Sequence, residues 1–484
     1  MIILDGEEGR LAKTDTYDGL TLRHPQAAHI RSSIALPDYA TSEAEHWKSA
    51  AQPKAKIDPR IWKGAVYSLG VYIFLSIVIV IPILVVKSRN HSQRQILWPA
   101  STLWSVESQD LPTPLQLSPS SAMILDNAKT CNIWNLTSSW NHSAKAYFSL
   151  PPTGFIAIRS NVTYNTVTPD QITGSLSVSR NQDPTAEQVL FTVDVQFSSQ
   201  EVQQKTNVCF SRTGSNRGIS IFVPSNLRVV DRFDLRIGIL LPRVKSTVDN
   251  FVVILPMLTQ NFDDLHPYPS FDNVNIEGAV RPITCEFLQA AQISIQNLAA
   301  PIKGTFNVTD SITLDSIKGS ITSDITLTHQ PSRLQPTLVT INTGDSAINT
   351  TITLHSSVNP IFASDSPSYV AKVANFNGPL DLSISSRNNS TALPFQLQVR
   401  NNLAKTSISL DATYQGSFSA RTKLSQVTLF ATRNNRSIEY DLNSGDMATG
   451  WTGFGPRPMR NSPTRQSYVE VVSALSPVKL TFGT

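Results

Sequence analysis

The sequence predicts an all-β domain that follows a single transmembrane helix. Three observations predict this: an uncharged apolar run at residues 64–86, apolar residues that alternate with polar ones after it, and glycines that open short strands. Half-buried strands place apolar side chains on every second residue, and no stretch of comparable length beyond residue 127 has the 3.6-residue period of a helix. We therefore expect a β-solenoid, a β-sandwich or both.

Residues 1–63 are expected to form a disordered cytosolic tail, since charges mix there with Gly, Thr and Ala and no period is sustained. Within this tail, Leu36-Pro37-Asp38-Tyr39 resembles the Pro/Tyr peptides that WW domains of ubiquitin ligases bind in an extended conformation. The alternative is an incidental turn. A WW-domain protein is thus one expected partner, through Leu36, Pro37 and Tyr39.

The run at residues 64–86, GAVYSLGVYIFLSIVIVIPILVV, is the expected membrane span. As a helix it would measure about 34 Å, enough to cross a hydrocarbon core of about 30 Å. It starts too late and is too long for a cleaved signal peptide, so we expect a signal-anchor. Five Lys or Arg residues lie within about 16 residues before it and three follow shortly after, which favours a cytosolic N-terminus, the type II orientation.

N-glycosylation sequons give a second, partly independent indication of this orientation, because all nine follow the span. Part of that asymmetry is compositional, since Asn is absent from residues 1–63. Asn90 would lie too close to the bilayer, and Asn388 and Asn389 would compete. The expected glycosylation sites are Asn135, Asn141, Asn161, Asn307, Asn349, Asn388 and Asn435.

Three cysteines, Cys131, Cys209 and Cys285, all lie in the part expected to be lumenal or extracellular. An oxidising compartment permits one disulfide among them, and the sequence does not say which two pair. The alternative is three buried small hydrophobic residues. No Cys/His cluster appears, so neither a zinc site nor any other metal or cofactor is expected.

The exported part is expected to comprise three regions. Residues 87–126 carry Pro among Ser and Thr and should form a semi-rigid stalk. Residues 127–270 have long alternating runs, which favour a sandwich-like part. In residues 271–484, Ile302-Lys-Gly-Thr-Phe recurs at Ile317 as Ile-Lys-Gly-Ser-Ile, which favours a solenoid-like part with glycines at its corners.

Candidate catalytic groups are few. The best local cluster is Asp263, Asp264 and His266, followed by Asp272 and Glu277, yet neighbouring residues of a strand point to opposite faces. The segment GWTGFGPRP at 450–458 has aromatic residues that look exposed and could stack on a sugar or cover the open end of a β-core. No nucleophile elbow, phosphate loop or metalloprotease motif occurs. We therefore expect no catalytic residue and no enzyme.

Two resemblances add to these expectations. The Gly-x-apolar strands of residues 285–435 resemble those of the adhesin-like family of β-solenoid domains. The layout as a whole resembles a family of uncharacterised single-pass membrane proteins of basidiomycete fungi. It does so through LPDY (36–39), RIWK (60–63), the anchor, a β-rich ectodomain, GWTGFGPRP (450–458), YVEVV (468–472) and VKLTF (478–482). The resemblance implies the location and architecture of a fungal membrane protein, and because that family has no established activity it transfers no catalytic residues.

The expected protein is a membrane-anchored, glycosylated β-protein of the cell surface or secretory pathway, with a structural or adhesion-like role. Its expected partners are the membrane, wall polysaccharide or a surface protein, and the small net charge of +4 gives no reason to expect nucleic acid. The alternative is a membrane-tethered carbohydrate-active β-helix enzyme. A weaker third reading makes the chain a trafficking receptor that works through its LPDY tail.

Overall fold

The computed structural model separates the chain into two compact units, Met1–Leu111 and Pro112–Thr484. All described residues belong to the second unit. They are residues 123–126, 129–132, 135–136, 143–161, 170–211, 217–224, 227–330, 335–356, 368–387, 393–432, 436–454, 457 and 467–483. The predicted tail, the predicted span at 64–86 and the stalk before residue 123 lie outside them. Within these ranges, no helix has the length and apolar character needed to cross a bilayer.

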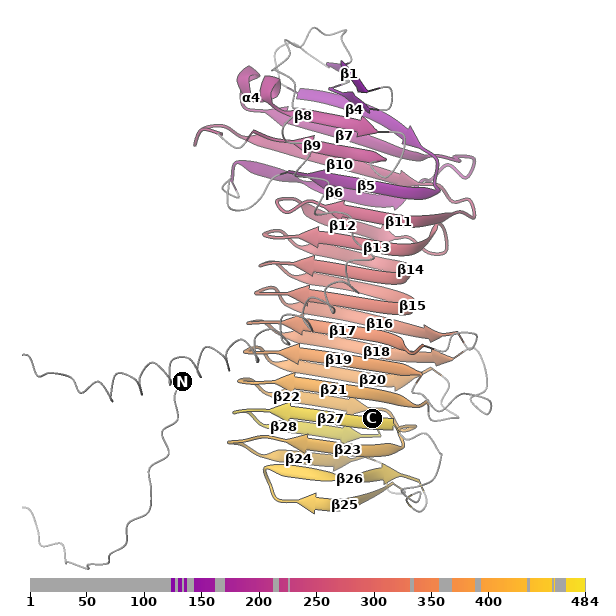
Figure 1. Ribbon diagram of the computed structural model, residues 1–484, viewed down its shortest axis with the longest axis vertical. Helices are drawn as coiled ribbons and strands as arrows, with labels where there is room; N and C mark the ends of the chain where they lie inside the picture. Colours follow the sequence, from indigo (N-terminus) through magenta and orange to yellow (C-terminus); the bar gives the residue numbers. More distant parts are fainter. Residues whose placement is uncertain are drawn as a thin grey trace, which may run out of the picture. The chain divides into compact units, whose positions relative to one another are not determined.

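The described part is nearly all β, as predicted: it has 28 strands and one short helix, α4 (Gln200–Lys205). The strands stack in a column in which two sheets lie face to face (Figure 1). Two long strands, β14 (Ile283–Asn297) and β15 (Ile302–Ser316), bend from one sheet into the other, so that their first halves belong to sheet I and their second halves to sheet II.

The remaining strands divide between the two sheets. Those of sheet I, in spatial order, are β3 (Asn135–Leu136), β4 (Ser143–Leu150), β7 (Val189–Phe197), β10 (Phe233–Leu241), β6 (Ile172–Arg180), β12 (Thr259–Asp264), β16 (Ile321–His329), β18 (Ile348–Ser356), β20 (Leu380–Ser386), β22 (Thr406–Leu410), β28 (Val478–Phe482) and β24 (Val427–Ala431). Those of sheet II are β1 (Met123–Asp126), β2 (Lys129–Cys131), β8 (Asn207–Ser211), β9 (Gly218–Phe222), β5 (Gly154–Ser160), β11 (Thr247–Ile254), β13 (Ser270–Gly278), β17 (Thr337–Thr343), β19 (Tyr369–Asn375), β21 (Phe395–Asn401), β27 (Ser467–Ser473), β23 (Gly416–Arg421), β26 (Met447–Gly453) and β25 (Ser437–Asn443).

Most of the column is a β-solenoid. From β10 to β24 in sheet I, and from β9 to β23 in sheet II, every neighbouring pair is parallel. Each coil contributes one strand to each sheet, and a short connection joins its sheet II strand to the sheet I strand that follows. The predicted boundary at residue 270 falls at the start of β13, inside this parallel stack.

The alternating sequence explains how the core forms. In β16, Ile321, Ser323, Ile325 and Leu327 are buried, while Thr322, Asp324 and Thr326 face out. Parallel pairing in register places equivalent residues of successive coils above one another, so that Ile325 is level with Ile352 and then with Ile384. Stacked rows of apolar side chains from both sheets thus fill the space between them.

Both ends of the stack depart from chain order. At one end, β27 lies between β21 and β23, and β28 lies between β22 and β24. At the other end, β5 lies between β9 and β11, and β6 lies between β10 and β12. Antiparallel strands then close the stack: β3, β4 and β7 in sheet I, β1, β2 and β8 in sheet II, and β25 with β26 beyond β23.

The 15-residue recurrence in the sequence is not the structural repeat. Ile302 begins a strand, whereas Ile317 lies in the connection that follows the same strand. The glycines of the two copies also differ in their surroundings. Gly319 approaches the carbonyl of Ala300 so closely that a Cβ would lie 1.9 Å from its oxygen, which explains why the corner needs glycine there.

Candidate functional site

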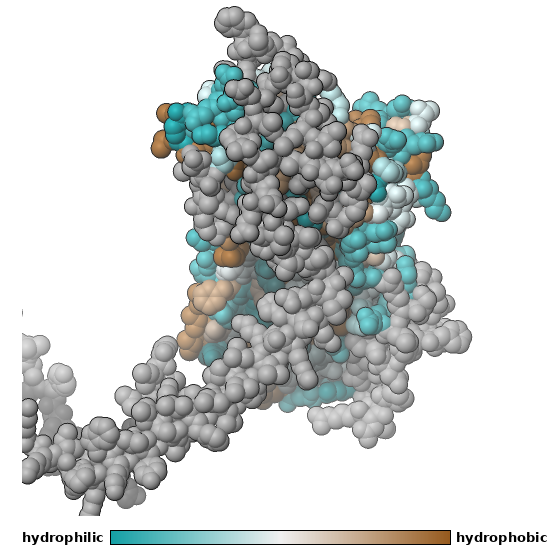
Figure 2. All heavy atoms as spheres, turned by 45° about the horizontal axis from the view of Figure 1, so that its top comes forward, coloured by the Kyte–Doolittle hydropathy of each residue, from teal (hydrophilic) through white to brown (hydrophobic). Residues whose placement is uncertain are grey.

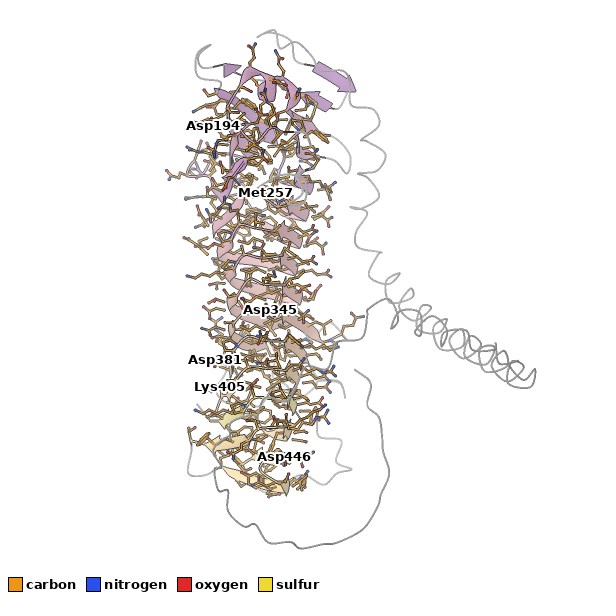
Figure 3. The ribbon with its side chains drawn as sticks, turned by 90° about the vertical axis from the view of Figure 1, so that its left-hand side faces the viewer. Asp194, Met257, Asp345, Asp381, Lys405 and Asp446 are labelled. Carbon is orange, nitrogen blue, oxygen red and sulfur yellow. A yellow bond between two sulfur atoms is a disulfide. The ribbon has the colours of Figure 1, made fainter. Side chains whose placement is uncertain are left out.

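The most regular feature of the column is the edge at which sheet II strands turn into sheet I strands. We call these connections the tight corners: 255–258, 279–282, 298–301, 317–320, 344–347, 376–379, 402–405, 422–426 and 474–477. All but one are four residues long. Figure 3 looks onto this edge, with Met257, Asp345 and Lys405 labelled on three of the corners. Backbone hydrogen bonds join neighbouring corners, for example from Leu403 N–H to Phe376 O at 3.0 Å.

A row of buried polar side chains supports the tight corners from within, and we call it the polar ladder. Its members share one position, at or just after the last residue of the sheet II strand. They are Asn297, Ser316, Thr343, Asn375, Asn401, Ser473 and Thr422. Because a four-residue turn leaves backbone groups unpaired inside the column, each side chain supplies them with a partner.

Asn375 shows how the ladder works. Its Nδ2 donates to the carbonyls of Ser346 at 2.9 Å and of Gly378 at 2.8 Å, and its Oδ1 accepts the Gly378 N–H at 3.1 Å. Asn401, on the next coil, also donates to the Gly378 carbonyl, at 3.1 Å. The ladder therefore ties each corner both to itself and to the adjacent coil.

The outer side of the tight corners carries a row of exposed apolar side chains, which we call the tight-corner ridge. Its members are Ile317 (55% exposed), Phe376 (53%), Leu403 (37%), Leu475 (47%) and Leu424 (77%). The last four lie on four successive coils, because β19, β21, β27 and β23 are neighbours in sheet II. Brown surface recurs down the left-hand edge of the view in Figure 2.

Charges beside the ridge are mostly positive. From residue 279 onward the tight corners contain four cations, Arg281, Lys318, Lys405 and Lys423, and one anion, Asp345, a net charge of 4 − 1 = +3. Neither the ridge nor the ladder was foreseen from the sequence. A sequence pattern of the corners is nevertheless present in NLAAPI (297–302), NFNGPL (375–380) and SALSPV (473–478). Each segment begins with a polar residue followed by an apolar one, and ends with Pro followed by an aliphatic residue.

The outer face of sheet I is flat and rich in Thr, Ser and Asn. Its outward positions on β16 and β18 include Thr322, Thr326, Asn349, Thr351 and Thr353. Hydroxyl and amide groups here repeat about every 4.8 Å between strands and about 6.7 Å along them. Such a face offers many weak hydrogen bonds, and it also carries the exposed carboxylates of Asp324 on β16 and Asp381 on β20.

Two of the predicted glycosylation sites lie on this face. Asn349 is exposed on β18, and Asn307 lies half-buried on β15, where its Oδ1 accepts a hydrogen bond from Thr328. Asn161 follows β5, and its side-chain amide accepts the Val223 N–H at 2.8 Å and donates to the Val223 carbonyl at 3.2 Å. Asn135 is in β3, and Asn141, Asn388 and Asn435 lie outside the described residues, as do Leu36, Pro37 and Tyr39 of the tail.

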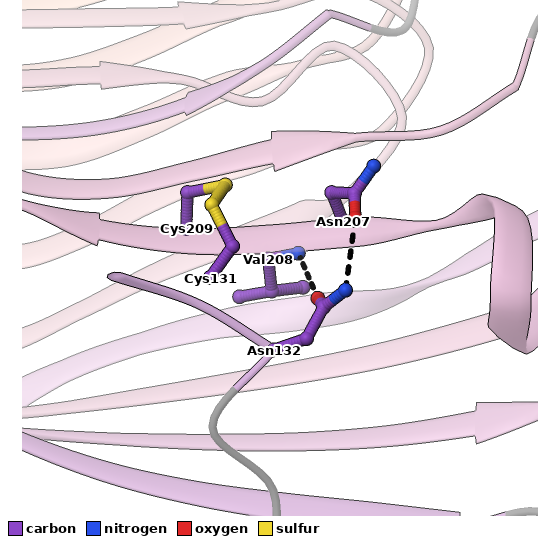
Figure 4. Close-up of a disulfide and its surroundings, with 5 residues drawn as sticks. All are labelled: Cys131, Asn132, Asn207, Val208 and Cys209. Carbon is purple, nitrogen blue, oxygen red and sulfur yellow. Dashed lines mark hydrogen bonds between the residues drawn. A yellow bond between two sulfur atoms is a disulfide. The ribbon is translucent and has the colours of Figure 1, made fainter. Parts of the chain in front are cut away.

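The structure pairs Cys131 with Cys209 in a disulfide that joins β2 to β8 (Figure 4). Next to it, Asn132 receives a hydrogen bond from Val208 N–H at 2.9 Å and donates to Asn207 Oδ1 at 2.8 Å. Cys285 remains a thiol within the core, and burial raises its pKa far above the ordinary value. A neutral, enclosed thiol is a poor nucleophile.

The carboxylates considered for catalysis do not come together. Asp264 accepts the N–H of His266 at 2.9 Å and pairs with Arg180 at 3.6 Å, so it stabilises the loop after β12. Asp272 and Glu277 lie on β13 in the other sheet, where Glu277 accepts a hydrogen bond from Asn275. Within the described ranges, no three His, Cys, Asp or Glu residues are grouped so that they could hold a metal ion.

Of the aromatic segment at 450–458, the described residues 450–453 belong to β26, which lies between β23 and β25 near one end of the column. Trp451, which looks exposed in the sequence, is only 2% exposed, so that expectation was wrong. Phe454 is partly exposed, and its ring lies 5.3 Å from the guanidinium of Arg436. Arg436 also lies over Phe482 and donates to the carbonyls of Asp411 and Tyr414. These contacts close the core and leave no sugar-binding platform at Trp451.

Comparisons with known proteins add little. No family model matches the chain, and no curated protein matches it. A solved structure from Clostridium sporogenes, described as a "putative cell adhesion protein", has 8% identity and a TM-score of 0.16 over 70% of this chain and 99% of that one. So low a score is no basis for transferring a fold or a function.

Proposed function

We propose that the chain is a membrane-anchored, glycosylated protein of the cell surface or secretory pathway, whose β-solenoid has a structural or adhesion-like role. The observation that carries the proposal is the solenoid itself, a long column of hydrogen-bonded coils with a flat polar outer face on sheet I. A rigid column of this kind suits display and repeated weak contacts, as in other stacked-repeat proteins.

Three further features support this proposal. The Cys131–Cys209 disulfide fits an oxidising compartment. The sequons follow the apolar run at 64–86, and Asn349 is exposed. The carboxylates considered for catalysis have structural partners instead of each other. We infer from the last of these features that the carboxylates act structurally, and we propose a protein that is not an enzyme.

The proposed partners are of two kinds. The flat face of sheet I would bind wall polysaccharide or a surface protein through its hydroxyl and amide groups. The cytosolic Leu36-Pro37-Asp38-Tyr39 segment would bind a WW-domain protein.

The test of location uses the full chain expressed in eukaryotic cells. Endoglycosidase should lower its apparent mass, and the variants Asn307→Gln and Asn349→Gln should each remove one glycan. In sealed microsomes, whose outer side is the cytosolic one, added protease should remove only the tail. A chain without glycans, or one whose C-terminal part faces the cytosol, would refute the location.

The test of role measures retention of the same full chain on beads of wall polysaccharide. The double variant Thr326→Glu with Thr353→Glu places charge on the face of sheet I, and Gln396→Glu on sheet II serves as the matched control. We expect retention to fall only in the double variant. If the protein instead degrades the polysaccharide, and Asp264→Asn abolishes this activity, the protein is an enzyme.

A further inference from the structure

The tight-corner ridge has no role in the function proposed above. Large apolar side chains scattered singly over a surface need no explanation, but aligned ones mark an interaction site. Here Phe376, Leu403, Leu475 and Leu424 follow one another on four coils, at about 4.8 Å per coil. With Ile317 two coils further on, the row extends over about 24 Å.

The shape of the ridge limits what can cover it. Each member lies in a turn at the edge of the column, so the row is convex, and hydrogen bonds between corners hold it straight. Small molecules, helical peptides and proline-rich peptides bind in concave sites, and extended peptides pair with the open edge strand of a sheet, which a row of turns does not offer. A convex apolar edge is better suited to enter a soft, deformable phase.

Charge distinguishes between the two remaining candidates that could cover the ridge, a second copy of this chain and a lipid surface. The corners of the six coils that the ridge covers contain Lys318, Lys405 and Lys423 against Asp345, a net charge of 3 − 1 = +2. Two of these lysines, Lys405 and Lys423, lie next to Leu403 and Leu424. A second copy of this chain, packed edge to edge, would bring these cations against one another. An anionic lipid surface would attract them and accept the apolar side chains at the boundary between headgroups and acyl chains.

We propose that the tight-corner ridge binds an anionic lipid surface. Phe376, Leu403, Leu475 and Leu424 enter the interfacial layer, and the stems of Lys405 and Lys423 lie along it with their ammonium groups at the lipid phosphates. The column then lies along the bilayer, with both sheet faces accessible. This binding is a property of the ridge and does not depend on adhesion or glycosylation.

The experiment uses the full chain in vesicles, with an environment-sensitive fluorophore on Leu475→Cys. Because Cys131 and Cys209 are paired and Cys285 is buried, the new thiol is the accessible one among the described residues. The matched control is Leu338→Cys, at a residue 44% exposed on the outer face of sheet II. Vesicles consist of phosphatidylcholine alone or with one fifth phosphatidylserine, each with nitroxide-labelled lipid as quencher.

We expect the probe at 475 to shift to the blue and to be quenched in the phosphatidylserine vesicles, while the probe at 338 stays in water. The double variant Lys405→Glu with Lys423→Glu should weaken membrane contact at 475 about tenfold or more, because each lysine loses an attraction and gains a repulsion. Unchanged thermal unfolding of this variant shows that the fold is kept.

Three outcomes would overturn the proposal: no quenching at 475, equal quenching at 475 and 338, or energy transfer between copies labelled at 475. The last would identify the ridge as a contact between two chains. A failure to bind polysaccharide would leave this result untouched, since the readout lies on a different edge of the column.

Discussion

The polar ladder makes a strong prediction about stability, for which Asn375→Ala is the sharpest perturbation. The side chain is almost fully buried and makes three hydrogen bonds, to the carbonyls of Ser346 and Gly378 and from the Gly378 N–H. Alanine removes all three. The Gly378 carbonyl keeps a bond from Asn401, whereas the Gly378 N–H and the Ser346 carbonyl lose the partner that the ladder gives them.

The magnitude follows from what is left unpaired. A typical hydrogen bond contributes about 1 kcal/mol net, and a buried group left without a partner costs about 1–3 kcal/mol. Two such groups give an expected loss of about 3 kcal/mol in the free energy of unfolding. Since a solenoid is stabilised mainly by contacts between neighbouring coils, the loss should concentrate in the coils of β18 to β21.

Urea unfolding and native-state hydrogen exchange of the full chain measure both quantities. The matched control is Asn342→Ala, an outward asparagine on β17, which should cost no more than about 0.5 kcal/mol. If Asn375→Ala cost as little as this control, or if protection fell evenly along the whole column, the ladder would not hold the corners together.

Other parts of the column give further predictions. Replacing Cys131 and Cys209 by serine should cost about 4 kcal/mol, because the bridge spans 78 residues and restrains the unfolded chain; an unchanged urea midpoint would contradict this. Gly378→Ala should cost more than about 2 kcal/mol, since its Cβ would lie 1.9 Å from a carbonyl oxygen, whereas Gly238→Ala, whose Cβ would make only an ordinary contact with Thr192 Cβ at 3.7 Å, should be nearly neutral in the same assay. Cys285 should resist alkylation in the native chain and react once urea unfolds it; rapid native labelling would show that the thiol is accessible.

The fold class could be read from the sequence because strand periodicity is local. The alternation predicts that Ile325 with Leu327, and Ile352 with Leu354, share one buried face, and all four are buried. The local pattern states which side of a strand faces inward. It does not state which strand lies alongside, because parallel neighbours are joined through long connections.

The candidate surfaces were harder to predict for a related reason. The corner pattern of NLAAPI recurs at irregular intervals, because the connections that lead from sheet I to sheet II differ in length. Strands β14 and β15 pass from one sheet to the other without a connection, whereas residues 357–368 separate β18 from β19. A search for a fixed period therefore finds the recurrence at Ile302 and Ile317 instead, whose members have different positions in the coil. The buried Trp451 was missed because sequence alone does not show what covers a side chain.

The strands that lie out of chain order affect how the column resists unfolding from its ends. A solenoid built strictly in chain order can lose coils one by one from an end, since each terminal coil has a single neighbour. Here β27 and β28 have neighbours on both sides, so they cannot leave before β23 and β24. The same holds for β5 and β6 at the other end. Interleaving raises the sequence separation of contacts and so slows folding, while it makes opening of the ends more cooperative. Slower folding combined with ends that resist opening suits a protein that folds once and then holds a fixed shape.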